Sequence, residues 1–136
     1  MTPLEEQQQQ RAEEDARYEE LRQWISSKLA HEMIKSELIG LYDEMDKLVR
    51  ILPKEPITPL QLKITNDLLR KAKSLLAEDT GIDQIEIFAG EASMPEYRDV
   101  IVVLRQIRQG LERFEVKNEF IFSSQFDDQL EEYNLQ

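Results

Sequence analysis

Residues 34–52 read IKSELIGLYDEMDKLVRIL, and this stretch decides the fold because its apolar side chains repeat at a heptad spacing. The repeating positions are Ile34, Leu38, Leu41, Met45, Leu48 and Leu52. Alternating steps of four and three residues place all six side chains on one stripe of an α-helix. The helical pattern extends upstream to about Glu13 without a proline, and Gly40 is the only glycine between Glu13 and Leu52. A long helix with one apolar stripe needs a partner surface, which the later segments should supply.

Helix-start residues after the first helix predict a second helix. The proline-rich connector after Leu52 ends the first helix, and Thr58 then stands where an N-cap residue belongs. Pro59 occupies the first helical position, and Gln61 completes a capping box with Thr58. We expect this helix to run from Thr58 to Thr80 and to end in a glycine C-cap at Gly81.

A third apolar stripe follows between Pro95 and Lys117. Its members are Tyr97, Val100, Leu104, Ile107, Leu111 and Phe114. Ser93 and Glu96 predict a second capping box at the start of this helix. The arginines opposite and beside the stripe are expected to form its solvated face; they are Arg98, Arg105, Arg108 and Arg113. Residues 82–94 are expected to form a short helical turn or a packed loop, because no second strand is present to pair with them.

These patterns predict an all-α protein, an antiparallel helical bundle of three main helices with one long N-terminal helix and a short C-terminal helix. The composition agrees, because four glycines in 136 residues are too few for a sandwich or a βαβ fold. We expect an acidic, Gln/Glu-rich lead-in over residues 1–20 that is disordered or fraying. The bundle domain should cover residues 21–118, and an acidic aromatic segment should cover residues 119–136.

The formal charge of −11 is concentrated at the two ends. Residues 1–20 hold seven carboxylates against two arginines, and residues 119–136 hold five carboxylates and no base. The body is therefore close to neutral, which disfavours nucleic acid as a partner because a phosphate backbone needs a basic face. No apolar segment approaches the ~20 residues of a membrane span, and the N-terminus has no secretory pattern, so a cytoplasmic protein is expected. The absence of cysteine excludes disulfides and cysteine-ligated metals.

A second apolar row lies in the N-terminal half of the long helix. Leu21, Ile25 and Leu29 are spaced four residues apart, about half a turn away from the heptad stripe. Either the helix breaks near Ser26 and Ser27, or one continuous helix packs against different partners at its two ends. The second alternative predicts a homodimer whose interface is formed by Leu21, Ile25 and Leu29.

The C-terminal segment has the pattern of a short amphipathic helix. Its apolar residues are Phe122, Phe126, Leu130 and Tyr133, its nearest acids are Asp127 and Asp128, and Ser123 or Ser124 stands at the N-cap position. Aromatic anchors with acidic neighbours favour docking in a basic groove of a protein partner. The alternative is that the segment folds back onto the basic side of the second helix around Arg70, Lys71 and Lys73.

Candidate catalytic residues are few. His31 begins a sequence resembling a zinc-protease helix, but Lys35 stands where the second histidine would be, so a metal site is not predicted there. Glu96 and Asp99 lie one helical turn apart, with further acids at 43, 44 and 46. Over this handful of residues the chain resembles the magnesium-binding helices of all-α nucleotide pyrophosphohydrolases of the MazG type. The resemblance implies that Glu96 and Asp99 hold magnesium to a triphosphate. The paired-glutamate element that the family carries upstream is absent.

The function predicted from the sequence is therefore a non-catalytic helical protein–protein interaction module without a cofactor, such as an adaptor, an assembly factor or a regulatory subunit. The alternative is a magnesium-dependent nucleotide pyrophosphohydrolase that uses Glu96 and Asp99.

Overall fold

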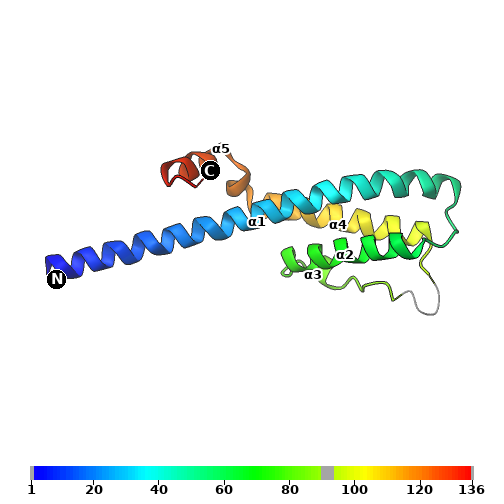
Figure 1. Cartoon of the computed structure of the whole chain (residues 1–136), viewed down its shortest axis with the longest axis horizontal. Helices are drawn as coiled ribbons and strands as arrows, with labels where there is room; N and C mark the ends of the chain where they lie inside the picture. The colour runs from blue at the N-terminus through cyan, green and yellow to red at the C-terminus, as the bar shows by residue number, and fades with distance from the viewer. Residues whose placement is uncertain (1, 90–93, 136) are drawn as a thin grey trace. The chain divides into compact units, whose positions relative to one another are not determined.

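The computed structural model describes residues 2–89 and 94–135, and its regular elements in these ranges are helices (Figure 1). They follow the chain in the order α1 (Pro3–Ile51), α2 (Pro59–Leu75), α3 (Thr80–Asp83), α4 (Tyr97–Lys117), the 3-10 helix η1 (Glu119–Phe122) and α5 (Ser124–Glu132). The prediction of an all-α bundle with one long N-terminal helix and a short C-terminal helix is confirmed.

The chain divides into two compact units. The first, here called the bundle unit, is Ala30–Lys117, and the second, the terminal unit, combines Met1–Leu29 with Asn118–Gln136. These boundaries differ from the predicted division into residues 1–20, 21–118 and 119–136, because the two chain ends belong to the same unit.

Helix α1 is continuous over 49 residues, so the chain does not break at Ser26 and Ser27. The helix begins at Pro3 rather than near Glu13, and the Gln/Glu-rich lead-in is therefore helical, with its side chains exposed. The amide of Gln9 donates to Glu13 one turn later, which is the kind of contact that adds only a few tenths of a kcal/mol to a solvated helix.

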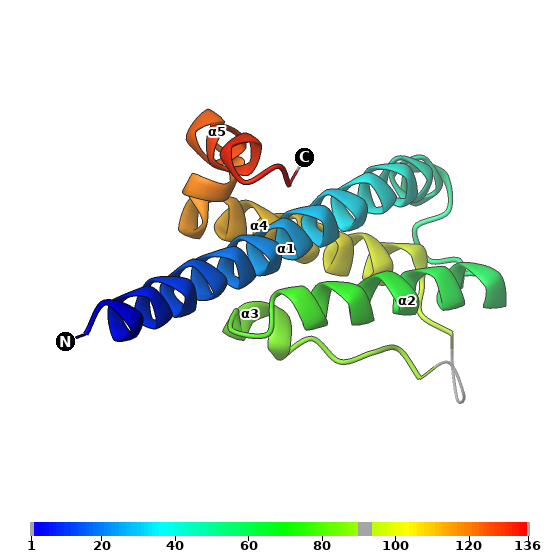
Figure 2. The same cartoon turned by 60° about the vertical axis from the view of Figure 1, so that its left-hand side comes forward.

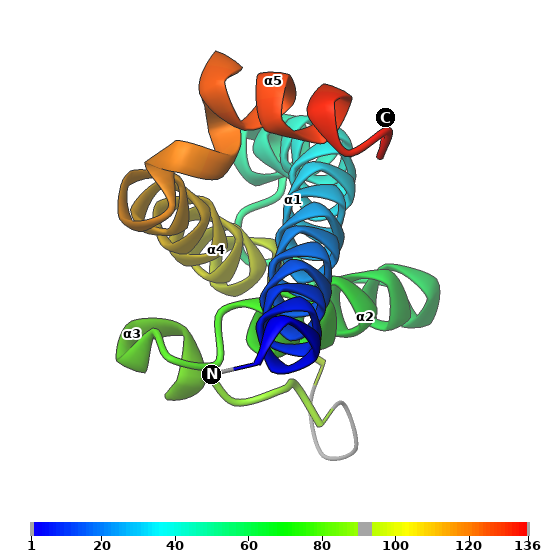
Figure 3. The same ribbon diagram turned by 90° about the vertical axis from the view of Figure 1, so that its left-hand side faces the viewer.

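In the bundle unit, α2 and α4 pack along the second half of α1, and the end-on view separates the three ribbons (Figure 3). Their buried faces form one core, as the heptad spacing predicts for Ile34 to Met45. The stripe does not continue as predicted, because Leu48 is only partly buried and Leu52 lies beyond the end of α1 and is 41% exposed. The members of the core include Ile34, Leu38, Leu41 and Met45 of α1, Leu68, Leu69 and Ala72 of α2, and Val100, Ile101, Leu104, Ile107 and Leu111 of α4. Burying each large aliphatic side chain contributes about 1.5–3 kcal/mol, which makes this stripe the main source of the unit's stability.

The start of α2 matches its prediction. The Thr58 hydroxyl accepts a hydrogen bond from the Gln61 N–H at 3.1 Å, and the Gln61 side chain accepts one from the Thr58 N–H at 2.9 Å. Pro59 occupies the first helical position. The capping box is therefore confirmed, and the Tyr97 hydroxyl of α4 also donates to the Gln61 side chain at 3.0 Å.

The predicted end of α2 is wrong. The helix stops at Leu75, several residues before Gly81, because Asp79 is the N-cap of the separate short helix α3. The Asp79 carboxylate accepts hydrogen bonds from the Gly81 and Ile82 N–H groups and from the Arg113 guanidinium, at 2.8 Å from Nε. These hydrogen bonds to Arg113 lower the pKa of Asp79. Gly81 thus lies inside α3 instead of ending α2.

The chain after α3 runs back beside α2, as Figure 2 shows. The buried Asn66 side chain of α2 holds it there, donating to the Phe88 carbonyl at 2.9 Å and accepting from the Phe88 N–H at 3.1 Å. Lys73 donates to the carbonyls of Asp83 and Ile85. One amide side chain and one lysine therefore hold the chain up to Phe88 as a packed loop, which is one of the two expected alternatives, whereas residues 90–93 lie outside the described residues.

The start of α4 is held by the proline-rich connector. The Tyr97 N–H donates to the Glu55 carbonyl at 3.0 Å, and the Arg98 N–H donates to the Pro53 carbonyl at 3.2 Å. The Asp99 carboxylate accepts from the Glu96 N–H at 3.0 Å. The helix begins at Tyr97 rather than Pro95, and the predicted capping residue, Ser93, lies outside the described residues.

Candidate interaction surface

The C-terminal segment packs on the N-terminal half of α1 within the terminal unit. The Trp24 ring lies edge-on to Phe120 and Phe126, with centroid distances of 5.6 and 6.0 Å. The Arg17 guanidinium lies over the Trp24 ring at 5.3 Å, and the Lys28 ammonium lies 5.8 Å from the centre of the Phe126 ring. This aromatic cluster, with a cation on each side, is the local reason why η1 and α5 stay ordered.

Several residues that were predicted to bind a partner are instead buried or partly buried within the terminal unit. Phe126 is 0% exposed, Leu130 is 9% exposed, and Phe122 and Tyr133 are partly buried. Asp127 forms an ion pair with Lys28 at 3.5 Å, whereas Asp128 is exposed. Phe126 is therefore not accessible as an anchor while the terminal unit is folded, and the partner role of this segment stays a prediction.

The alternative prediction, that this segment folds back onto the basic side of α2, is wrong. The three cations named in that prediction have partners inside the bundle unit: Arg70 pairs with Asp67 at 3.1 Å, Lys71 pairs with Glu37 at 2.9 Å, and Lys73 donates to the carbonyls of Asp83 and Ile85. Segment 118–135 instead belongs to the same unit as residues 2–29. Trp24 and Lys28, which the sequence reading did not connect with α5, supply the aromatic surface and the cation. The local N-cap prediction holds, because the Ser123 side chain accepts from the Phe126 N–H.

The predicted dimer face does not lie open along its whole length. Leu21 is 0% exposed in the single chain and Ile25 is partly buried, whereas Leu29 is 54% exposed. A dimer through Leu21, Ile25 and Leu29 stays a prediction, but only Leu29 presents most of its side chain to solvent.

The two carboxylates of the enzymatic alternative have local structural roles. Asp99 caps the first turn of α4 through the Glu96 N–H, and Glu96 forms an ion pair with the neighbouring Arg98, Oε2 to Nε, at 2.6 Å. Over residues 2–89 and 94–135, no group of three or more His, Asp or Glu side chains is placed to hold a metal ion. The observed contacts of Glu96 and Asp99 are those of a helix start.

His31 is buried between α1 and α4. Its ring is 1% exposed and stacks on Phe114 with the centroids 5.5 Å apart, and its Nε2 lies 3.2 Å from a Glu115 carboxylate oxygen. Burial lowers the pKa of His31 below its ordinary value, although Glu115 acts in the opposite direction. His31 is therefore a structural residue packed between two helices, and its charge state depends on pH.

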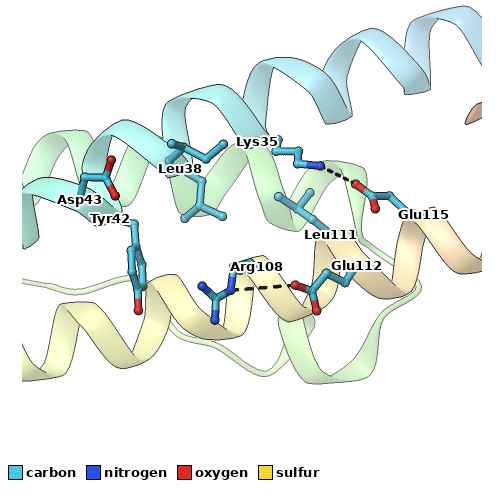
Figure 4. Close-up of a pocket in the computed structure, with 9 residues that line it drawn as sticks. Lys35, Leu38, Tyr42, Asp43, Arg108, Leu111, Glu112 and Glu115 are labelled. Atoms are coloured by element: carbon cyan, nitrogen blue, oxygen red, sulfur yellow. Dashed lines mark hydrogen bonds and ion pairs between the residues drawn. The ribbon is translucent and has the colours of Figure 1, made fainter. Parts of the chain in front are cut away.

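An open groove lies beside this contact, between α1 and α4 of the bundle unit (Figure 4). Its volume is about 430 Å³, and its floor is formed by the buried side chains of Leu38 and Leu111. Ile39 lines the groove from α1 and is 54% exposed. Within the bundle unit, an exposed isoleucine beside an apolar floor has the character of a contact surface.

Charged and aromatic side chains form the rim of this groove. Lys35 of α1 pairs with Glu115 of α4 at 3.1 Å, and Glu112 lies 4.0 Å from Arg108. Toward the other end, the Arg108 guanidinium lies 5.3 Å from the Tyr42 ring centre. The Tyr42 hydroxyl accepts a hydrogen bond from Arg105 at 3.2 Å, which raises the pKa of that arginine.

A second, shallower groove runs between α1 and α2. It has a volume of about 380 Å³ and is lined by Leu41, Ile64 and Leu68, with Glu37, Glu44, Asp67 and Lys71 at its edges. Ile64 is 45% exposed. This groove provides a useful comparison, because it has an exposed isoleucine but a different arrangement of charges.

The groove between α1 and α4 was not predicted from the sequence. Arg105 and Arg108 were predicted to lie on a solvated face, and both are exposed, but their contacts with α1 were not predicted. The available signal was the order of charges along α4, in which two bases at 105 and 108 are followed by two acids at 112 and 115.

No protein family, no curated protein and no solved structure matches this chain. Within the described ranges, no helix is both long enough and apolar enough to cross a membrane.

Proposed function

We propose that this protein is a non-catalytic helical protein–protein interaction module, of the adaptor, assembly-factor or regulatory-subunit kind, and that it binds through the groove between α1 and α4. The observation that carries the proposal is the combination of a buried apolar floor, an exposed Ile39 and a charged rim in one groove of about 430 Å³.

Each part of the groove has a role in such binding. Ile39 and the floor beneath it supply apolar area, whose removal from water contributes about 25 cal/mol per Å². The rim charges select the partner and its register, because an opposing like charge would be desolvated without compensation. The helices that carry these groups are held by a common core, so the groove is largely formed before the partner arrives.

The test is photocrosslinking in the native host, with a benzophenone amino acid replacing Ile39 in one variant and Leu60 in the other. Leu60 is a suitable control, because it is 66% exposed on α2 and does not line the α1–α4 groove. The proposal expects a discrete crosslinked product, either a homodimer or a complex with another protein, from position 39 only. Equal products from both positions, or none from position 39, would contradict it.

A further inference from the structure

The charges around the α1–α4 groove form an alternating pattern. At one end, Lys35 of α1 pairs with Glu115 of α4, and at the other end, Asp43 of α1 follows Tyr42, whose ring contacts Arg108 of α4 (Figure 4). The sign of the charge therefore changes along each helix and also across the groove. Lys35, Asp43, Arg108 and Glu112 have exposed side chains, so they can reach a partner.

The spacing along each helix is symmetric about the middle of the groove. On α1, Lys35 and Asp43 stand four residues before and after Ile39. On α4, Arg108 and Glu112 stand two residues before and after Gly110, and Arg105 and Glu115 stand five residues before and after it. The contacts Lys35–Glu115 and Tyr42–Arg108 show that α1 and α4 run antiparallel, with Ile39 near the level of Gly110.

We propose that the occupant of this groove is a second copy of the same chain, related by a twofold axis that passes near Ile39 and lies across the two helices. This rotation places each α4 antiparallel to the α4 of the partner, and each α1 antiparallel to its counterpart. Arg108 then faces Glu112 of the partner subunit, Arg105 faces Glu115 of the partner subunit, and Lys35 faces Asp43 of the partner subunit. Twofold symmetry forms each pair twice, as an isologous interface requires.

Ile39 selects this axis over the other twofold that the charges allow. An axis parallel to the helices would also bring opposite charges together, but it would set each Ile39 against the charged side chains of the partner's α4. The axis across the helices brings the two Ile39 side chains against each other at the centre, where apolar contact excludes water. The rim charges surround this contact and oppose a register shift, because a shift along α4 would place like charges face to face.

A second copy suits this groove better than an unrelated helix, because its complementary charges follow from symmetry alone. This inference rests on the proposed function, since it names the partner that the α1–α4 groove binds.

Sedimentation equilibrium of the full chain across the micromolar range tests it. The wild-type mass should approach twice the 16.1 kDa of the chain as the concentration rises. Ile39→Asp should weaken the dimer at least about tenfold, since the change enters the interface twice and each tenfold corresponds to about 1.4 kcal/mol. Ile64→Asp is the matched control, because Ile64 is 45% exposed in the other groove, and it should leave the dissociation constant within about twofold.

Charge exchange tests the arrangement of the two copies. Glu112→Arg should weaken the dimer at least about tenfold, because it opposes Arg108 of the partner subunit. The double variant Arg108→Glu/Glu112→Arg should restore much of the affinity, because the antiparallel pair is then re-formed with reversed signs. Glu112 and Arg108 have side chains that are 65% and 53% exposed, so both variants should keep the wild-type helical circular dichroism, which is recorded for each.

A monomeric mass throughout the range would overturn the inference, and so would a dimer that Ile64→Asp disrupts and Ile39→Asp does not. Failure of the double variant to recover affinity would overturn the proposed axis. None of these results would refute the proposed function if position 39 still crosslinks to another protein. Absence of any product at position 39, together with a monomeric mass, would refute both.

Discussion

Two glycines inside long helices of the bundle unit should respond in opposite ways to the same substitution. A β-carbon added at Gly40 of α1 meets nothing within 4 Å. A β-carbon added at Gly110 of α4 would lie 2.7 Å from Ile82 Cγ1, 2.8 Å from Ile82 Cδ1 and 3.0 Å from Leu76 Cδ1. Glycine in a helix interior costs about 0.5–1 kcal/mol relative to alanine, so this gain is common to both substitutions.

The difference arises from packing. At Gly40 the higher helix propensity of alanine is not offset by a steric clash, so Gly40→Ala should raise the free energy of unfolding by about 0.5–1 kcal/mol. At Gly110 the new methyl group presses on Ile82 and Leu76, which are 0% and 4% exposed and have little room to move. Overpacking of this kind costs about 1–3 kcal/mol, so Gly110→Ala should lower the free energy of unfolding by as much as about 2 kcal/mol.

Guanidinium unfolding at one protein concentration, followed by far-UV circular dichroism, measures both changes. Trp24 fluorescence in the same samples reports the terminal unit, which neither substitution touches, and it serves as an internal control. The reasoning would be refuted if Gly110→Ala stabilised the protein as much as Gly40→Ala, because α3 would then not pack on α4 as described.

Three further predictions concern other sites. Because burial lowers the pKa of His31, the unfolded chain binds a proton more readily between the folded pKa and about 6.5, so stability should fall as the pH drops through that window. A His31→Gln variant should show a flatter dependence of melting temperature on pH there, and an unchanged slope would contradict the assignment. Phe126→Ala should destabilise the terminal unit by about 3–5 kcal/mol, seen as an earlier Trp24 fluorescence transition, whereas Asp128→Ala at an exposed position should leave that transition in place. The pure protein with magnesium and a panel of nucleoside triphosphates should release no pyrophosphate; release that disappears in Glu96→Ala or Asp99→Ala would instead establish the hydrolase alternative.

Local signals in the sequence were dependable where the interaction itself is local. The capping box of Thr58 and Gln61 and the N-cap at Ser123 are hydrogen bonds between residues three apart, and both are present. The end of α2 was misplaced for the converse reason. Gly81 has the residue type of a C-cap, but Asp79 begins α3 instead, and its partner Arg113 is 34 residues away.

The candidate sites likewise combine features set by neighbouring residues with features set by contacts between distant parts of the chain. The spacing of Phe122, Phe126 and Leu130 predicted an amphipathic C-terminal helix. Its packing against Trp24 and Lys28 could not be predicted, because it depends on contact between the two ends of the chain. The groove between α1 and α4 was unreadable as a site, because its rim joins Lys35 to Glu115 across 80 residues.

The sequence by itself therefore determined the helical class, the apolar stripes and the helix starts. These depend on periodicity and on hydrogen bonds within one turn, both of which are properties of neighbouring residues. Only the tertiary structure decided where α2 ends, which surface holds α5, and that the charges of α1 and α4 face one another around Ile39. Those outcomes depend on which side chains far apart in the chain are brought within a few ångströms, and helical periodicity leaves that choice open.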